Sequence, residues 1–287
     1  MSTPALFIGV VSYVGSRFSI SQGEGGLAAL LADTLEQRGI PTAVSVSTDD
    51  RHDPALLPID DSVIQGSLSA QQQLEDAWLD YVRAGKAPSA RARANSALRW
   101  GRRQWRRLRG PGPGPVTRLI NIELAHAALL SAGLASRAPW ILIVEDDAAA
   151  LDVADCAEGA LGLMASVPDS VAFVNVSESF PLAELGIDHL LTPSAQPWAG
   201  QVPRSVLTAE RPVTNTVCAI LYRATFAAEL LAEFDRMPMT PVVPIDWKLN
   251  AALMHMHADG RLGPDSCLLV SPGPIDQLSM RPTAETP

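Results

Sequence analysis

Three consecutive carboxylates, Glu145-Asp146-Asp147, follow directly on the apolar run 140–144. A short apolar run is typical of a buried strand, so the carboxylates are expected at that strand's carboxyl end. Like charges this close repel one another, and a divalent cation that prefers oxygen ligands, such as Mg²⁺ or Mn²⁺, would remove the penalty. Alternate residues of an extended segment face the same way, so Glu145 and Asp147 can reach one ion together. The alternative is an acidic helix N-terminus, for which one Asp would suffice.

A second group of polar residues follows the first two expected strands. The loop over residues 13–26 contains four glycines and Arg17, and a guanidinium group matches phosphate oxygens. Glycine-rich loops allow backbone amides to approach phosphate, although this spacing matches neither the dinucleotide-binding nor the P-loop pattern. A surface loop is an equal interpretation. Asp49 and Asp50 follow the second strand, where an exposed turn is the alternative to a ligand-binding role.

The segment Met254-His255-Met256-His257 resembles a metal site at first sight. On a helix, residues two apart point in nearly opposite directions, so His255 and His257 cannot both face one ion. A single ligand, His257, is compatible with that geometry, and a surface histidine is the alternative.

The elements that must position these residues alternate between strand-like and helix-like patterns. Strands are expected over residues 6–12, 43–47, 140–144, 171–176, 216–222 and 267–270, and helices over 27–38, 65–83, 120–134, 151–165, 223–234 and 245–257. The opening order of strand, loop, helix and strand predicts an α/β fold with a mostly parallel central sheet flanked by helices. Ligands bind such sheets at the carboxyl ends of the strands. Residues 180–212 are expected to be irregular.

The segment 83–118 interrupts this order. It contains eleven Arg and Lys residues and no Asp or Glu, whereas the whole chain carries a net charge of −9. We expect a single domain over residues 1–287 with 83–118 inserted as a basic helical arm. An acidic body with one basic arm predicts an anionic partner for the arm. Trp100 and Trp105 among arginines favour an anionic lipid surface, a solvated or partner-docking helix is the bland alternative, and nucleic acid is disfavoured because no reader motif accompanies the arm.

Composition limits the class of protein. Apolar residues make up 47% of the chain and charged residues 18%, which is typical of a globular chain and excludes a disordered one. The longest uninterrupted apolar runs fall far short of the roughly 20 residues of a membrane helix. No basic residue precedes Arg17, so no secretory signal is expected. Three cysteines far apart in apolar contexts predict buried thiols. We therefore expect a cytoplasmic protein, peripheral at the inner face of the membrane if the arm binds lipid.

Two family resemblances bear on the acidic segment. The string from Ile141 to Asp147 resembles the start of a response-regulator receiver domain, but the later strand over 171–176 lies too close and ends without the required aspartate.

The chain as a whole is similar to GT-A fold glycosyltransferases, most of all to the family 25 type (lipopolysaccharide and procollagen galactosyltransferase-like). The matching pieces occur in the family's order: the first strand with Arg17, a helix with Asn121 and His126, the motif Glu145-Asp146-Asp147, the strand and helix over 219–231, the triplet Pro244-Ile245-Asp246, and the closing segment 271–279. The basic insertion and Trp247 depart from the pattern.

This resemblance implies metal-dependent, inverting transfer of a sugar from a nucleotide-diphosphate sugar to an acceptor hydroxyl. The implied cofactor is Mn²⁺ or Mg²⁺, held by Asp147 and Glu145 with His257 as a further ligand. Asp246 is implied as the general base, and the start of a helix is expected to keep it ionised. A plain N-cap is the alternative for Asp246. The implied donor-binding residues are Ser12, Arg17, Asp49, Asp50, Glu145, Asp146 and Gln277.

The implied acceptor is a cell-envelope glycan or a lipid-linked glycan. The competing hypothesis is a non-catalytic module, with a degenerate GT-A-like or receiver-like domain that binds a ligand or partner without turnover. On the amphipathic helix over 120–134, His126 is expected to be a packed or surface histidine.

Overall fold

The fold is α/β, as the sequence predicts, and is built on one eight-stranded sheet. The computed structural model describes residues 3–12, 26–47, 52–55, 57–83, 113–179, 182, 186–214, 216–237 and 243–280, together with residues 98, 101 and 105. The strand order is β2 (Thr42–Ser47), β1 (Leu6–Val11), β3 (Trp140–Glu145), β8 (Ala219–Arg223), β5 (Phe173–Asn175), β9 (Cys267–Ser271), β7 (Ser205–Ala209) and β6 (Leu191–Pro193).

The sheet is mixed, so the expectation of a mostly parallel sheet is wrong. Among the described strands, β1 is parallel to both β2 and β3, and β5 is parallel to β9. The other four pairs are antiparallel, and β8 runs opposite to both of its neighbours, β3 and β5. The prediction of a parallel sheet rests on the opening order of strand, loop, helix and strand, which holds for β1, α1 and β2 but does not determine the direction of the later strands. The buried run of β8 has the same composition whichever way the strand runs, so the sequence carries no sign of its direction.

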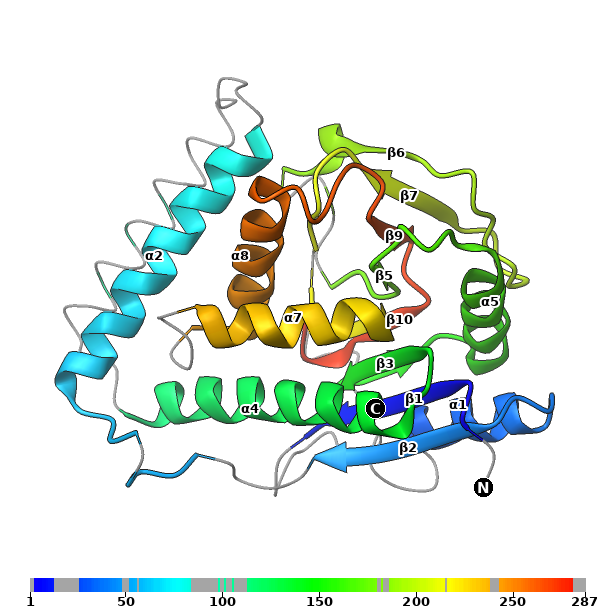
Figure 1. The fold of residues 1–287 in the computed structure, drawn as a ribbon, viewed down its shortest axis with the longest axis horizontal. Coiled ribbons are helices and arrows are strands. Elements are labelled where there is room, and N and C mark those ends of the chain that lie inside the picture. Colours follow the sequence, from blue (N-terminus) through cyan, green and yellow to red (C-terminus); the bar gives the residue numbers. More distant parts are fainter. Residues whose placement is uncertain are drawn as a thin grey trace.

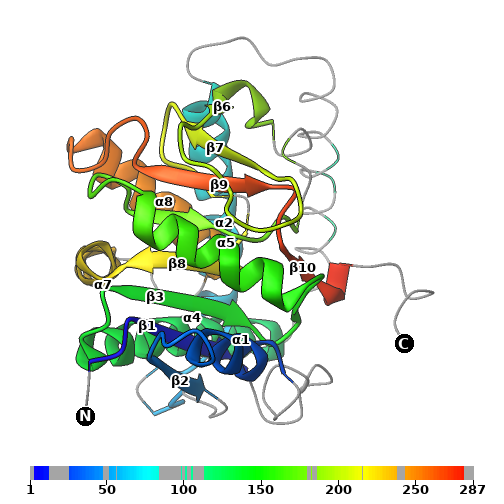
Figure 2. The ribbon, with the colours of Figure 1, turned by 90° about the vertical axis from the view of Figure 1, so that its right-hand side faces the viewer.

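Helices cover both faces of the sheet, as Figures 1 and 2 show. Helices α1 (Leu27–Glu36) and α5 (Val153–Ser166) pack on one face. On the other face lie α4 (Pro113–Ser136), α7 (Ala224–Arg236) and α8 (Ile245–Ala258), with α2 (Asp61–Arg83) packed against α8. This six-helix arrangement, counted over the described residues, is consistent with a GT-A-like class.

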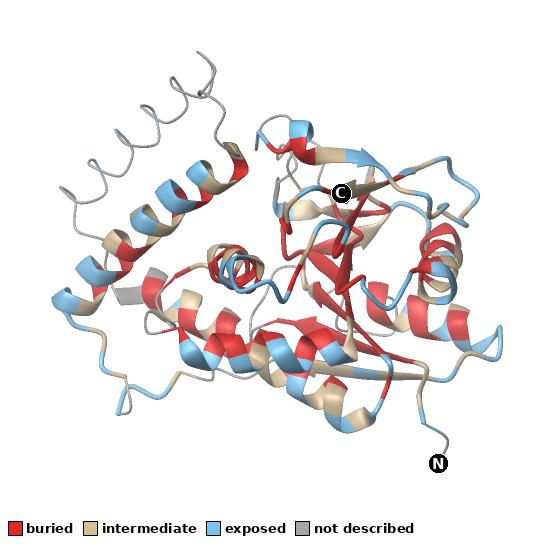
Figure 3. Ribbon diagram, turned by 45° about the horizontal axis from the view of Figure 1, so that its top comes forward, coloured by how far each residue is buried: buried red, intermediate tan, exposed pale blue. Residues whose placement is uncertain are grey.

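Side chains of the central strands alternate between these two layers. In β3, Ile141 and Ile143 belong to the core beneath α4, α7 and α8, whereas Leu142 and Val144 belong to the core beneath α1 and α5. This follows from the two-residue period of a strand. Figure 3 shows that the strands in the middle of the sheet are buried. Strand β3 is buried along most of its length, and its last residue, Glu145, is only partly buried. The same alternation directs Glu145 toward the α4 and α8 layer.

Helix α4 contains a stretch, Val116–Ser136, that is long and apolar enough to cross a membrane. Uninterrupted apolar runs in the sequence do not reveal this stretch, because polar residues interrupt it. In this fold Ile120, Leu129 and Leu130 are buried, and α4 packs on β1, β3 and α7. These contacts are consistent with a core helix of the α/β fold.

The expected basic arm falls mostly outside the described residues. Helix α2 ends at Arg83 and α4 begins at Pro113, so the last six residues of the expected arm belong to α4. Of the residues between the two helices, Leu98 and Trp105 are described and both are exposed.

The stretch expected to be irregular, 180–212, contains two short strands, β6 and β7, of which β7 pairs with β9. Between these strands, Trp198 packs on α5 beside Gly159. A buried ion pair between Arg204 and Asp155 holds the same segment, with 3.3 Å between Arg204 Nε and Asp155 Oδ2. These two contacts, here called the clamp, hold the segment 198–204 against α5. The Trp198 contact requires a glycine at position 159, because a side chain there would occupy the space of the ring.

This clamp predicts opposite effects for two helical glycines. A methyl group on Gly159 would lie 2.0 Å from ring atoms of Trp198, whereas a methyl group on the exposed Gly66 of α2 would meet nothing within 4 Å. Gly159→Ala should therefore destabilise the protein by about 1–3 kcal/mol through overpacking. Gly66→Ala, the matched control, should stabilise it by about 0.5–1 kcal/mol through helix propensity. Urea unfolding of both variants measures the two effects, and equal shifts would contradict the clamp.

Candidate functional site

One edge of the sheet collects most of the residues that could do chemistry. Strands β1, β2 and β3 are parallel and end at this edge, where Ser12 and Glu145 lie. Because β8 is antiparallel to β3, its start lies at the same edge. There the backbone N–H of Glu145 donates to the carbonyl of Cys218, with 2.8 Å between N and O. The reversed direction of β8 therefore places Cys218 beside Glu145.

The acidic motif forms the turn between β3 and β4 (Ala148–Ala150). Strand β4 pairs with β10 (Ile275–Gln277) in a separate two-stranded sheet. Gln277 Nε2 donates to Glu145 Oε2 over 3.0 Å, and Ser12 Oγ donates to Asp146 Oδ2 over 3.3 Å. The structure thus brings two residues of the expected donor site, Ser12 and Gln277, into contact with the acidic motif.

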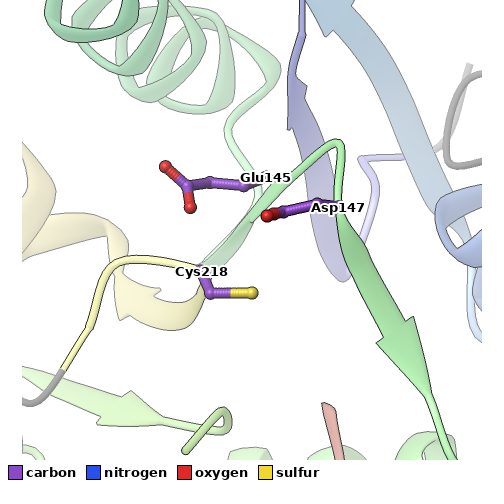
Figure 4. Close-up of side chains that lie close together, drawn as sticks. All are labelled: Glu145, Asp147 and Cys218. Carbon is purple, nitrogen blue, oxygen red and sulfur yellow. The ribbon is translucent and has the colours of Figure 1, made fainter. Parts of the chain in front are cut away.

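Two of the carboxylates and one thiol form a compact group of potential metal ligands. One ligand atom from each of Glu145, Asp147 and Cys218 lies within 4.8 Å of the others (Figure 4). Asp147 is 6% exposed, and its Oδ1 has no hydrogen-bond partner in the part of the chain that the structure describes. A buried, unpaired carboxylate oxygen is unfavourable, and a bound cation would satisfy it.

Burial and charge also perturb Glu145. Withdrawal from water, followed by the charges of Asp147 and Asp146, raises the pKa of Glu145 to about 8. Arg118, two helical turns before His126 on α4, acts in the opposite direction. Arg118 falls within the expected basic arm, 83–118, but its charge acts on Glu145 of the acidic motif.

His126 and Asp246 approach the motif from α4 and α8. His126 is buried, and its Nε2 lies 3.9 Å from Glu145 Oε1 without a hydrogen bond to any described residue. Burial lowers the pKa of His126 to about 4, so the imidazole is neutral at pH 7. The buried position agrees with the packed alternative for His126, but its place beside Glu145 does not follow from the helical pattern.

Asp246 lies in the first turn of α8, where its Oδ1 accepts a hydrogen bond from Val217 N over 3.0 Å. Withdrawal from water, and then the charge of Glu145, raises the pKa of Asp246 to about 6. The helix N-terminus therefore does not lower the pKa of Asp246 below its ordinary value, although the carboxylate is still mostly ionised at pH 7. The helix dipole favours the ionised form by only about 0.3–1 kcal/mol, and burial beside another carboxylate outweighs it.

A buried polar network holds the backbone of the site. Asn175 at the end of β5 donates to Thr214 Oγ1 over 2.7 Å and to the carbonyl of Thr216 over 2.8 Å. Thr216 Oγ1 accepts from the backbone N–H of Cys218 over 3.1 Å. Asn250 of α8 accepts from Thr214 N over 3.1 Å. The network ties β5, the segment before β8 and α8 together. In the sequence, the sign of this network is the polar Asn175 within the apolar run 171–176.

Other expected site residues lie elsewhere or outside the described residues. His257 is close to the end of α8, about 16 Å along the helix axis from Asp246 at the usual rise per residue. Its Nδ1 lies 3.0 Å from the carbonyl of Leu262 and its ring packs edge-on against Tyr81. The geometry does not support His257 as a ligand beside Asp147. Arg17, Asp49 and Asp50 lie outside the residues that the structure describes.

Two further features are unrelated to the acidic motif. Asn121 on α4 accepts a hydrogen bond from the backbone N–H of His52 over 2.6 Å, so it fixes a loop. An open hollow of about 830 Å³ lies at the opposite edge of the sheet, near the start of β2 and the end of α4. Its lining includes Glu36 and Arg137 but none of the site residues above, so we do not assign it the chemistry.

Comparison with known proteins adds no assignment. No protein-family model and no curated protein matches the chain.

Proposed function

We propose that the protein is a glycosyltransferase that moves a sugar from a nucleotide-diphosphate sugar to an acceptor hydroxyl with the help of a divalent cation. The observation that carries the proposal is the buried Asp147 oxygen without a described partner, which lies among Glu145 and Cys218 at the edge where the central parallel strands end. Ligands of α/β folds bind at that edge. The resemblance to GT-A glycosyltransferases gives this site its reaction class.

The residues present fit a divalent cation. Glu145 and Asp147 supply carboxylate oxygens, and Glu145 has a raised pKa that a nearby positive charge would lower. A cation held by these two residues would neutralise the charge that develops on the departing diphosphate. Gln277 and Ser12 orient Glu145 and Asp146 through the hydrogen bonds described above. Arg118 adds a positive charge that acts on Glu145.

Asp246 fits the role of general base. A general base works best with a pKa close to the working pH, and Asp246 is shifted toward neutrality, to about 6. At pH 7 it is mostly ionised and can accept a proton from an acceptor hydroxyl. The hydrogen bond from Val217 fixes one carboxylate oxygen. The proposal is inverting transfer, in which one base suffices and no covalent intermediate forms.

The acceptor class is proposed from the basic segment 83–118. Its arginines, with the exposed Leu98 and Trp105, suit an anionic membrane surface, where a lipid-linked or envelope glycan would be met. The corresponding location would be peripheral, at the cytoplasmic face of the membrane.

The donor site can be tested by calorimetry with UDP and GDP, with and without Mn²⁺. We expect metal-dependent nucleotide binding in the wild type and its loss in Asp147→Asn, because that change removes a charged ligand. Asp80→Asn removes a carboxylate from exposed α2 and is the matched control that should bind normally. If no nucleotide binds with any metal, or if Asp147→Asn binds as well as the wild type, the proposed donor site is wrong.

The role of Asp246 predicts a separation of binding from turnover. Asp246→Asn should lower the rate of sugar transfer or donor hydrolysis by about 10²–10⁴-fold, the usual contribution of a general base. Nucleotide affinity should change little. The assay is turnover of a panel of UDP- and GDP-hexoses, beside calorimetry on the same samples. Unchanged turnover would remove Asp246 from the mechanism and favour another base.

The raised pKa of Glu145 predicts a pH-dependent stability. The pKa is about 8 in the folded protein against an ordinary value of 4.5, so ionisation is harder in the folded state. The stability that comes from this group is therefore present below about pH 4.5 and is lost as the pH rises toward 8. Metal-free wild type should lose on the order of a few kcal/mol more stability between pH 5 and pH 8.5 than Glu145→Gln, whose side chain stays neutral.

Urea unfolding at both pH values in the presence of EDTA measures this difference. Added Mg²⁺ should reduce the loss in the wild type, because the cation stabilises the ionised carboxylates. Identical pH profiles for the two proteins would show that Glu145 titrates normally.

A further inference from the structure

Cys218 is the least expected member of the acidic site. It is fully buried, and its Sγ belongs to the group of three ligand atoms that lie within 4.8 Å of one another. Figure 4 shows Glu145, Asp147 and Cys218 projecting from β3, the turn after it and the segment before β8, with their side-chain ends close together. The ligands thus come from two segments far apart in the chain, the acidic motif and Cys218, and the fold brings them together.

The position of Cys218 is fixed by its backbone. Its carbonyl accepts from Glu145 N over 2.8 Å, and its own N–H donates to Thr216 Oγ1 over 3.1 Å. These bonds fix the backbone of Cys218 relative to the acidic motif. The thiol is therefore presented to the carboxylates by β-sheet geometry.

An independent observation points to a missing ligand at the same place. Asp147 is more than nine-tenths buried, and its Oδ1 has no partner among the described residues. Buried carboxylate oxygens are normally hydrogen-bonded or bound to a metal. Cys218 and Glu145 are the neighbouring potential ligands, and they leave this oxygen without a hydrogen bond.

The chemistry of a thiol narrows the choice of ion. Mg²⁺ binds oxygen ligands almost exclusively, whereas thiolate ligands select softer ions. Metal–sulfur bonds of about 2.3 Å and metal–oxygen bonds of about 2.0–2.2 Å require ligand atoms close to one another. The three ligand atoms lie within 4.8 Å of one another, which places them around one possible ion position. On binding, the thiol proton leaves to solvent as the metal–sulfur bond forms.

We propose that Cys218 Sγ is a ligand of the cation held by Glu145 and Asp147, and that the site consequently takes Co²⁺ or Zn²⁺ in preference to Mg²⁺. This inference rests on the proposed cation site and specifies the kind of ion. It assigns Cys218, which the family resemblance does not, to the metal centre.

The test is a titration of the metal-free protein with Co²⁺, followed by near-ultraviolet absorption. A thiolate bound to Co²⁺ gives an intense charge-transfer band that carboxylates do not give. We expect the band in the wild type and its loss in Cys218→Ser, Cys218→Ala and Asp147→Asn. The other two cysteines provide matched controls: Cys156→Ser and Cys267→Ser remove buried thiols on α5 and β9 and should keep the band.

Competition against Mg²⁺ gives a second readout. Loss of an outer partner of a metal ligand typically weakens binding by about 10–100-fold, so loss of a direct thiolate should lower Co²⁺ affinity by at least about tenfold. Mg²⁺ affinity should change much less. Thermal unfolding of each variant in EDTA shows that the variants are folded, and two substitutions at Cys218 guard against one of them failing to fold.

The outcomes separate this inference from the proposed function. If Mn²⁺ or Mg²⁺ binds but the wild type shows no Co²⁺ charge-transfer band, or if Cys218→Ser keeps the band, Cys218 is not a ligand and the cation site stands without it. If no divalent ion binds to the wild type, the cation site itself is wrong and the metal-dependent part of the proposed function fails with it.

Discussion

The electrostatic repulsion among the carboxylates at the end of β3 is the constraint on which the rest of the site depends. Glu145, Asp146 and Asp147 are consecutive, and Asp246 of α8 is close enough that the charge of Glu145 raises its pKa. Withdrawal of such groups from water is unfavourable unless positive charge or hydrogen bonds compensate it. The charge of Arg118 and the hydrogen bonds from Gln277 and Ser12 offset part of this unfavourable free energy. The buried Oδ1 of Asp147 has no such partner among the described residues.

The fold holds this unfavourable cluster in place through buried contacts around it. The pairing of β3 with β8 sets the position of Cys218, and the network of Asn175, Thr214 and Thr216 fixes the segment that leads into β8. A buried ion pair between Glu123 of α4 and Lys248 of α8 joins the helices that carry His126 and Asp246. A rigid surround of this kind allows carboxylates to stay close together, and preorganised charge is the largest single term in many enzyme mechanisms.

Much of the scaffold could be predicted from the sequence because its signals are local. The apolar run before Glu145 and the spacing of leucines after residue 27 place β3 and α1 within one or two residues of their observed bounds. The direction of β8, the position of His126 and the proximity of Cys218 could not be predicted, because they arise from contacts between segments far apart in the chain. The distance of His257 from the acidic motif has a related cause: α8 approaches the site with its first turn, whereas His257 lies in its last turn. The sign of the Asp246 shift depends on burial, which a sequence does not state.

We propose that a divalent cation and a nucleoside diphosphate bind together at the edge where β3 ends. The most direct measurement is a crystal structure of the protein grown with UDP or GDP and Mn²⁺, with anomalous diffraction data collected to locate the ion. We predict an anomalous peak from an ion bonded to Asp147 and Glu145, with the diphosphate of the nucleotide on the other side of the ion. An ion bound elsewhere, or a nucleotide bound away from the acidic motif, would contradict the account.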